Sequence, residues 1–293
     1  MAASARATRC YYGYARPLAA ALPRPAYLAR GLRIVAEALR SFFYPQFENA
    51  LLRLRPVANV DHPLDVSVPL DPRRVGTYSD FVRLWMGAFY KLDRLYGARA
   101  QSEIGDFLDA IRSLYAEAGS VYKVIHSTTT RPARNYNFHF AIIHAFDPHL
   151  ACVPSLHVLL VVSTWLLATE SAERLGLDRA EGLGAGQVRA WLSSLRAEAL
   201  AITESVLYVK QHSINCIGAS LFYLKRRFPR FGEAEAAAFA AELFASGPVE
   251  PDTAKALRAA ALELCASLER GYAREPGRGW RGPILDFLRG YLA

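Results

Sequence analysis

Apolar residues recur at helical spacing near the start of the chain. The apolar positions are Leu28, Leu32, Val35, Leu39 and Phe42. The other faces carry charged residues: Arg30, Arg33, Glu37 and Arg40. Because steps of three and four residues place side chains on one face of a helix, the pattern predicts an amphipathic helix. We expect its apolar face to pack against a protein core; docking on a membrane surface is the alternative.

The same spacing predicts further helices along the chain. Their ranges are Ser79 to Gly97, Ser102 to Gly119, Ser155 to Thr169, Val188 to His212, Glu233 to Ala245 and Asp252 to Tyr272. Between them, the proline-rich segment from Pro56 to Arg74 is interpreted as an extended connector. Because strand signals are otherwise nearly absent, the sequence predicts an all-α fold, a helical bundle with its active-site pocket between central helices.

The helices and the connector divide the chain into three regions. Residues 1–76 comprise a basic N-terminal arm, the amphipathic helix and the Pro-rich connector. Residues 77–228 are expected to form the helical core that carries the chemical motifs. Residues 229–293 are expected to form C-terminal helices that pack on this core.

Composition indicates a globular, basic protein. Of 293 residues, 52% are hydrophobic and 21% charged, and the net charge of +8 favours a negatively charged partner. A phosphate ester or anionic lipid headgroups fit this charge; nucleic acid fits less well, because the arginines are not interleaved with aromatic residues. The cysteines are widely spaced without a C-x-x-C pair, which favours reduced thiols: Cys10, Cys152, Cys216 and Cys265.

The termini and apolar runs bear on localisation. Six arginines precede the first acidic residue, Glu37, but no continuous apolar segment marks a secretory signal peptide. An organelle transit segment, a membrane-surface arm and a frayed basic terminus remain open. The longest run without Asp, Glu, Lys or Arg, from Pro148 to Thr169, contains two histidines and suits a buried helix better than a membrane span. We expect membrane association, with a soluble cytoplasmic protein as the alternative and the oligomeric state open.

Histidines cluster in the middle of the chain, where five of the seven lie between residues 126 and 157. His139, His144 and His149 are five residues apart, so on a helix each ring is turned about 140° from the last. They therefore cannot converge on one metal ion as an i, i+4 pair does. The sequence predicts no metal site and no cofactor.

The segment Pro154-Ser155-Leu156-His157 has the features of an anion site. Ser155 is suited to cap the apolar helix that follows it, and His157 falls in the first turn of that helix. Free backbone N–H groups and the positive end of the helix dipole favour phosphate at this position.

A second segment supplies another histidine. Ser205 and His212 are seven residues apart and would share a face of a continuous helix, with Cys216 one turn further. Lys210 adds a cation, and Lys123 and Arg131 lie upstream. Two neutral histidines with cations nearby suit metal-free phosphoryl transfer, in which one ring attacks phosphorus and the other protonates the leaving oxygen.

These motifs resemble the three-part signature of the type 2 phosphatidic acid phosphatase and vanadium haloperoxidase superfamily. The matching residues are Lys123-x7-Arg131-Pro132, Pro154-Ser155-Leu156-His157 and Ser205-x6-His212. The Pro-Ser-Leu-His form and the Lys-Gln-His ending look most like its inositol phosphorylceramide synthase branch. The resemblance covers about a third of the chain.

The resemblance implies a function and a role for each residue. His212 would be the nucleophile, His157 the general acid, and Lys123, Arg131 and Ser155 the phosphate ligands. The expected activity is that of a phosphatase or phosphotransferase on a phosphate ester, most simply a lipid phosphate at an anionic membrane surface, through a phosphohistidine and without metal.

The chain also departs from the family pattern. Seven residues rather than six separate Lys123 from Arg131, and Val206 stands where many members have arginine, leaving Lys210 as a substitute. Cys216 stands where the family has the aspartate that orients the nucleophilic histidine. Loss of the carboxylate in a comparable triad costs a factor on the order of 10⁴ in rate.

Three consequences of that replacement remain open. The protein could be a slow enzyme in which Cys216 and Ser205 are weak orienting groups. Another carboxylate, Asp147 or Glu204, could replace the missing aspartate. The third alternative is a catalytically impaired helical protein that binds phosphate or anionic lipid.

Overall fold

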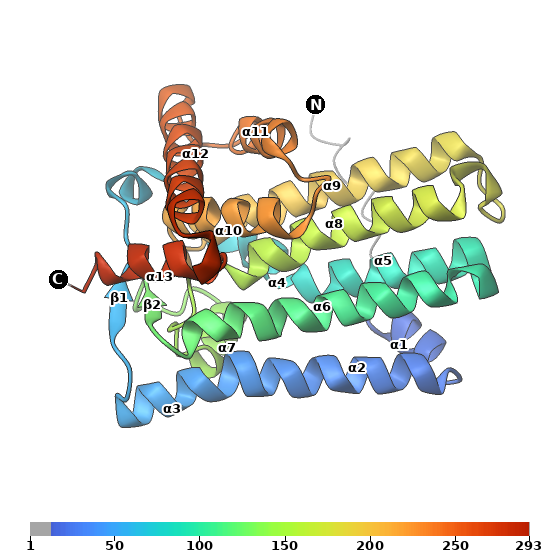
Figure 1. The fold of residues 1–293 in the computed structure, drawn as a ribbon, viewed down its shortest axis with the longest axis horizontal. Coiled ribbons are helices and arrows are strands. Elements are labelled where there is room, and N and C mark those ends of the chain that lie inside the picture. Colours follow the sequence, from blue (N-terminus) through green and yellow to red (C-terminus); the bar gives the residue numbers. More distant parts are fainter. Residues whose placement is uncertain (1–12, 293) are drawn as a thin grey trace.

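The computed structural model describes residues 13–292 and is almost entirely helical (Figure 1). Cys10 and the first part of the basic arm lie outside the described residues. The α-helices are α1 (Ala15–Ala21), α2 (Pro25–Ala38), α3 (Tyr44–Leu52), α4 (Val75–Ser79), α5 (Phe81–Tyr96), α6 (Gln101–Tyr122), α7 (Phe138–Phe146), α8 (Leu156–Leu175), α9 (Ala185–Tyr208), α10 (Ile214–Arg227), α11 (Glu233–Glu242), α12 (Pro251–Arg274) and α13 (Arg281–Arg289). The predicted all-α fold is confirmed.

Shorter elements connect these helices. A π-helical turn, η1 (Leu39–Phe43), joins α2 to α3, and the 3₁₀ segments are η2 (Pro63–Ser67), η3 (Pro72–Arg74), η4 (Gly97–Ala100), η5 (Leu177–Arg179) and η6 (Pro276–Arg278). Two three-residue strands, β1 (Val57–Asn59) and β2 (His126–Thr128), pair in parallel, with Val57 opposite His126. This pairing fixes the connector beside the end of α6.

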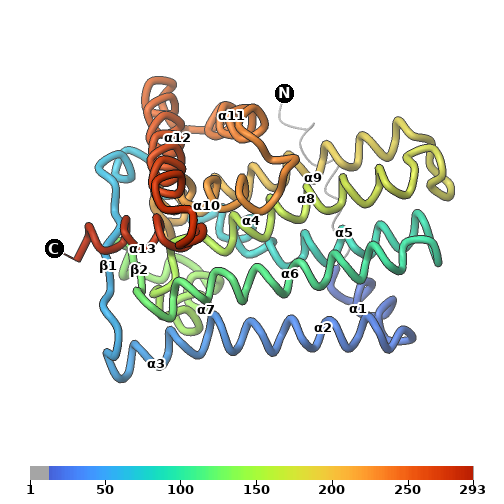
Figure 2. Tube along the Cα trace, viewed as in Figure 1, coloured from blue at the N-terminus to red at the C-terminus, as the bar shows by residue number. Residues whose placement is uncertain are grey.

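The long helices form a bundle around α8. α8 packs against α9, α5 and α6, and α2 lies along α6 on the outside of the bundle. α12 packs on α10 and runs at a steep angle to the other long helices (Figure 2). A single hydrophobic core extends from Tyr27 to Leu288, so all three regions expected from the sequence contribute to it.

The amphipathic helix is present, but its orientation differs from expectation. Leu28, Leu32, Val35 and Leu39 face outward, with Leu32 62% exposed. The opposite side of the helix is buried against α6 through Tyr27, Ile34, Glu37 and Ser41. The expectation that the leucine stripe packs on the core is therefore wrong. One aromatic, one aliphatic and two polar side chains fill the interface instead, and a glycine in α6 allows η1 to approach that helix closely.

That glycine is Gly119. A Cβ at this position would lie 2.5 Å from the Cβ of Ser41, closer than atoms can approach without displacement. The sequence predicted that Gly119 ends the helix, but α6 continues to Tyr122. Gly119 serves helix packing here rather than helix termination.

The helix expected from Val188 to His212 ends earlier, at Tyr208. Lys210 has a φ of 54°, in the left-handed region, and Ser213 caps a new helix by accepting a hydrogen bond from the Asn215 N–H. The interpretation of residues 205–216 as one continuous helix is therefore wrong. His212 lies in a tight turn between α9 and α10, where the chain reverses.

Among residues 13–292, no helix combines the length and the apolar character that crossing a membrane requires.

Candidate functional site

Two separate helix ends bring His157 and His212 together. His157 is the second residue of α8, and His212 lies in the α9–α10 turn, where its N–H donates to the Val206 carbonyl at 3.2 Å. The ring centroids are 5.5 Å apart and the planes are inclined by 67°. Both side chains are buried. The two histidines singled out in the sequence are thus neighbours across a small hollow in the bundle. The hollow is lined by Phe42, Asp147, His149, Ala151, Cys152, Leu156, His157 and His212.

Ser155 lies at the same hollow. As N-cap of α8 it accepts a hydrogen bond from the Val158 N–H, and its own N–H donates to Ser220 Oγ at 2.9 Å. Its Oγ is 3.5 Å from Nε2 of His212. The N–H groups of Leu156 and His157 in the first turn have no intrahelical acceptor, which is a general property of helix starts. This end of α8 therefore offers donors beside Nε2 of His212.

Burial keeps both rings neutral. Loss of solvation lowers the pKa of His212 to about 4, partly offset by the Cys152 carbonyl. Burial, with His212 adding to it, holds the pKa of His157 well below its ordinary value. Nδ1 of His212 is buried and, among the described residues, lacks a hydrogen-bond partner of normal geometry. The ring is therefore neutral near neutral pH, and a neutral imidazole has one unprotonated nitrogen that can act as a nucleophile.

A third histidine and a carboxyl group complete the hollow. His149 is buried, its Nε2 lies 2.9 Å from Thr129 Oγ1, and burial lowers its pKa to about 3. The Asp147 Oδ1 accepts the His149 N–H at 2.8 Å, and burial raises the pKa of Asp147. The sequence interpretation gave His149 no role at the site beyond excluding it from a metal centre. The sequence feature that could have identified it is its place in the run from Pro148 to Thr169, which has no charged residue and also contains His157.

Arg131 stands at the edge of this group. Its Nη1 donates to the Asp147 carbonyl at 3.1 Å, and its charge lowers the pKa values of Asp147 and His149. It also borders a second, wider cleft of about 500 Å³, which is lined by side chains from residues 61–70 and 130–132 and by Lys210. Of the three cations proposed as phosphate ligands, Arg131 is the one whose charge acts on the hollow.

The structure directs Lys210 away from the histidines. Its Nζ donates to the Asp65 carbonyl at 2.5 Å and to the Val68 carbonyl. The side chain thus holds η2 against the α9–α10 turn, and Asp65 Oδ1 accepts the Ile214 N–H at 2.9 Å. Lys210 therefore stabilises the turn, in which its own backbone has a left-handed conformation.

Lys123 is likewise elsewhere. It is the exposed C-cap residue of α6, and its Nζ donates to Ser41 Oγ at 3.3 Å, next to Glu37 and Arg40. It does not line the histidine hollow. The expected role of Lys123 as a phosphate ligand is not supported by this position, because its side chain is directed to Ser41 of η1.

The expected orienting residues also have other partners. The Cys216 Sγ accepts the Ser213 N–H at 3.4 Å, and burial raises the pKa of this thiol, so it is neutral. Ser205 donates to the Ile202 carbonyl of its own helix at 2.7 Å. Glu204 accepts the Phe244 N–H at 2.6 Å, outside the hollow. Of the two alternative carboxylates, Asp147 is the one at the site.

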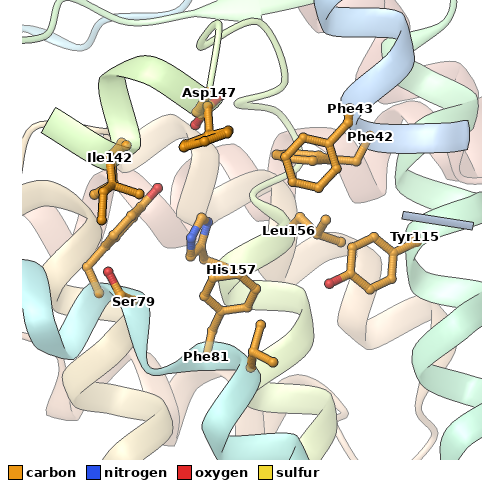
Figure 3. Close-up of a pocket in the computed structure, with 13 residues that line it drawn as sticks. Phe42, Phe43, Ser79, Phe81, Tyr115, Ile142, Asp147, Leu156 and His157 are labelled. Carbon is orange, nitrogen blue, oxygen red and sulfur yellow. The ribbon is translucent and has the colours of Figure 1, made fainter. Parts of the chain in front are cut away.

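An apolar pocket of about 300 Å³ adjoins His157 (Figure 3). Phe42 and Phe43 of η1 form one wall, Ile142 of α7 lies on the opposite side, and His157 lies between them. The other lining residues are Tyr78, Ser79, Phe81, Val82, Tyr115, Ile143, Phe146, Asp147 and Leu156. The walls are almost entirely hydrocarbon, so the pocket suits an apolar group attached to whatever reaches His157.

Within the described part of the chain, no group of three or more His, Cys, Asp or Glu side chains is placed to hold a metal ion. The hollow instead brings two uncharged imidazole rings to the start of α8, and Arg131 lies outside its lining, hydrogen-bonded to the Asp147 carbonyl. That set can accept an anion and exchange protons with it.

Comparison with models of known protein families, with curated proteins and with solved structures gives no match.

Proposed function

We propose that the protein is a phosphatase or phosphotransferase that acts on a lipid phosphate ester through a phosphohistidine at His212. The observation that carries the proposal is the pairing of His157 and His212, with ring centroids 5.5 Å apart, at the N-terminus of α8. The resemblance of its motifs to the signature of the type 2 phosphatidic acid phosphatases supports the same proposal.

The reaction would proceed in two displacements. Nε2 of His212 attacks phosphorus, the bond to the ester oxygen breaks, and protonated His157 gives its proton to the leaving alcohol. Neutral His157 then removes a proton from water or a second alcohol, which attacks phosphorus and breaks the P–N bond. Free His212 and protonated His157 result, so the cycle closes.

Charge on the substrate would prepare the acid. In the empty hollow burial keeps His157 neutral, but a phosphate anion beside the ring favours the imidazolium form and raises its pKa. Ser155, the α8 N–H groups and Arg131 would bind the equatorial oxygens. This assignment drops Lys123 and Lys210 from the ligand set, because both are engaged elsewhere.

The apolar pocket supports a lipid rather than a sugar or nucleotide substrate. It begins at His157, where the leaving oxygen would be protonated, and its aromatic walls suit a hydrocarbon chain on that alcohol. Water and an alcohol are both chemically competent as the second nucleophile, so hydrolysis and headgroup transfer use the same residues.

A second function is favoured by one specific observation. Nδ1 of His212 has no carboxylate partner among the described residues, and Cys216 bonds to Ser213 instead. A protein that binds anionic lipid phosphates without turnover would keep the hollow and the pocket while lacking the orienting group. The two candidates differ in covalent chemistry and can be separated directly.

The test uses purified protein with labelled phosphatidate and with an activated phosphate ester, with and without vanadate. The enzyme proposal expects phosphate release that vanadate inhibits, and acid-stopped protein that carries label on His212. His212→Ala should abolish labelling, while His157→Ala should retain it with the activated ester, whose leaving group needs little protonation. His139→Ala, an exposed histidine on α7, is the matched control.

The result that overturns the enzyme proposal is label retained in His212→Ala, or no turnover of either ester. If lipid phosphate then still binds to wild type and to His212→Ala with similar affinity, the binding function stands. Cys216→Asp adds a further comparison: a clear gain in turnover supports a slow enzyme, whereas a binding protein gains little.

A further inference from the structure

The N-terminal helices expose a long apolar surface, which we call the leucine face. Its members lie in α1, α2, η1 and α3 or directly after α1 and α3, and are Leu18, Leu22, Leu28, Leu32, Val35, Leu39, Phe47, Leu51, Leu52 and Leu54. α2 and α3 follow one another along one edge of the bundle (Figure 1). Exposed apolar side chains gathered on successive helices of a folded chain indicate an interaction site.

The charges around the leucine face are positive. Residues 13–54 contain six arginines and two glutamates. Glu37 accepts a hydrogen bond from Arg40, and Glu48 accepts one from Arg55, so both carboxylates are neutralised by pairing. Arg33 follows Leu32 and is exposed, as is Arg53 after α3. Arg24, Arg30 and Arg40 are paired with carboxylates. The positive charge offered to a contacting surface therefore comes from exposed arginines such as Arg33 and Arg53.

Exposed apolar side chains also lie at the aromatic pocket. On α7, Phe138, Ile142 and Phe146 are exposed and spaced four residues apart, so they share one side of the helix. Ile142 and Phe146 also line the pocket, whose other wall is η1. η1 continues directly from α2, so the same stretch of backbone carries Leu39 of the leucine face and Phe42 and Phe43 of the pocket wall.

We propose that the leucine face docks the protein on the surface of an anionic lipid bilayer. The leucines enter the boundary between headgroups and acyl chains, and Arg33 and Arg53 lie at the level of the headgroup phosphates. Charge favours this occupant over a second copy of the chain, because a symmetric contact would bring two arginine-flanked faces together. The inference goes beyond the proposed reaction and does not require turnover.

The experiment measures co-sedimentation of the full-length protein with phosphatidylcholine vesicles, with and without phosphatidylserine. Wild type should bind the anionic vesicles, and added salt should weaken binding. Leu32→Gln with Val35→Gln should lower the partition coefficient about tenfold or more, because two buried aliphatic side chains become polar. Arg33→Gln with Arg53→Gln should lower it roughly 5- to 30-fold on anionic vesicles and little on neutral ones.

Matched controls keep the test specific. Val66→Gln removes an exposed aliphatic side chain that does not belong to the leucine face. Arg189→Gln with Arg270→Gln removes two positive charges, as Arg33→Gln with Arg53→Gln does, but from exposed sites on α9 and α12. Both controls should bind as wild type does. Circular dichroism establishes that each variant is folded before its binding is compared.

Three outcomes overturn the proposal. In the first, the wild type binds neither kind of vesicle. In the second, the controls lose as much affinity as the leucine-face variants. In the third, the wild type is a dimer that binds no vesicle and that Leu32→Gln with Val35→Gln dissociates. Phosphate release is not part of the measurement. Bound protein without activity would therefore contradict only the reaction, and active protein that ignores vesicles would contradict only the docking surface.

Discussion

The ring of Tyr78 lies against the imidazole of His157, with centroids 4.2 Å apart and planes inclined by 26°. Phe81 contacts the same imidazole edge-on at 4.4 Å. Two aromatic side chains from α4 and α5 thus hold His157 and keep water from it. The protonation of His157 depends on this enclosure as much as on any charged neighbour.

Removing the stacked ring should change that protonation. Tyr78→Ala should admit water and raise the pKa of His157 toward its ordinary value near 6.5, because desolvation is the main cause of the lowered value. Tyr78→Phe keeps the ring and should leave the pKa low. Titration of the His157 ring protons by NMR measures both; equal pKa values in the two variants would contradict the explanation.

Arg131 should be sensitive to replacement by lysine. Under the proposed reaction, Arg131→Lys should lower kcat/KM about tenfold or more, since a lysine cannot supply the two-pronged charge-assisted contact worth about 1.5–3 kcal/mol. Arg134→Lys, three residues on in the exposed part of the same loop, is the control. Comparable kcat/KM in both variants would remove Arg131 from the phosphate ligands.

Lys210 should matter to stability rather than to substrate affinity. In Lys210→Ala the buried carbonyls of Asp65 and Val68 lose their donor, which should lower the free energy of unfolding by about 1–3 kcal/mol. Urea denaturation measures the loss. A variant as stable as wild type but with a raised KM would instead return Lys210 to the ligand set.

Acid should destabilise the fold through the buried histidines. The pKa of His212 is about 4 when folded and near 6.5 when unfolded, so between these values the unfolded chain binds more protons. The free energy of unfolding should therefore fall as pH decreases from 7 to 4 and change little from this residue below that. Its share is at most about 3 kcal/mol.

The measurement is urea denaturation at several pH values in this window. His212→Gln should flatten the dependence, whereas His139→Gln, at an exposed position, should not. An unchanged slope in His212→Gln would show that other groups cause the acid sensitivity.

The aromatic pocket should select for chain length. Ile143→Trp fills part of it and should raise KM for a long-chain phosphatidate while sparing a short, soluble ester. Val124→Trp, at an exposed position outside the pocket, is the control. An equal effect on both substrates would argue that the chain does not occupy the pocket.

Sequence periodicity was sufficient for the all-α fold and for the N-cap at Ser155, since both depend on local spacing and capping. It could not give the orientation of α2, because the buried face is set by contacts with α6, among them the close approach of Ser41 in η1 to Gly119. It likewise placed His212 on a helix, although a distant carbonyl pair stabilises the left-handed turn at Lys210. His149 was missed because its proximity to His212 arises only from tertiary folding.

The contact of Lys210 with η2 ties the histidine site to a part of the chain outside the sequence motifs. Both histidines and Ser155 lie between residues 77 and 228, but the carbonyls that anchor the His212 turn belong to Asp65 and Val68. Phe42, which borders both the hollow and the pocket, is also outside that range. Residues 77–228 alone therefore do not contain all the contacts that position the site. Transferred to another protein, this segment would carry both histidines without the residues that fix their positions.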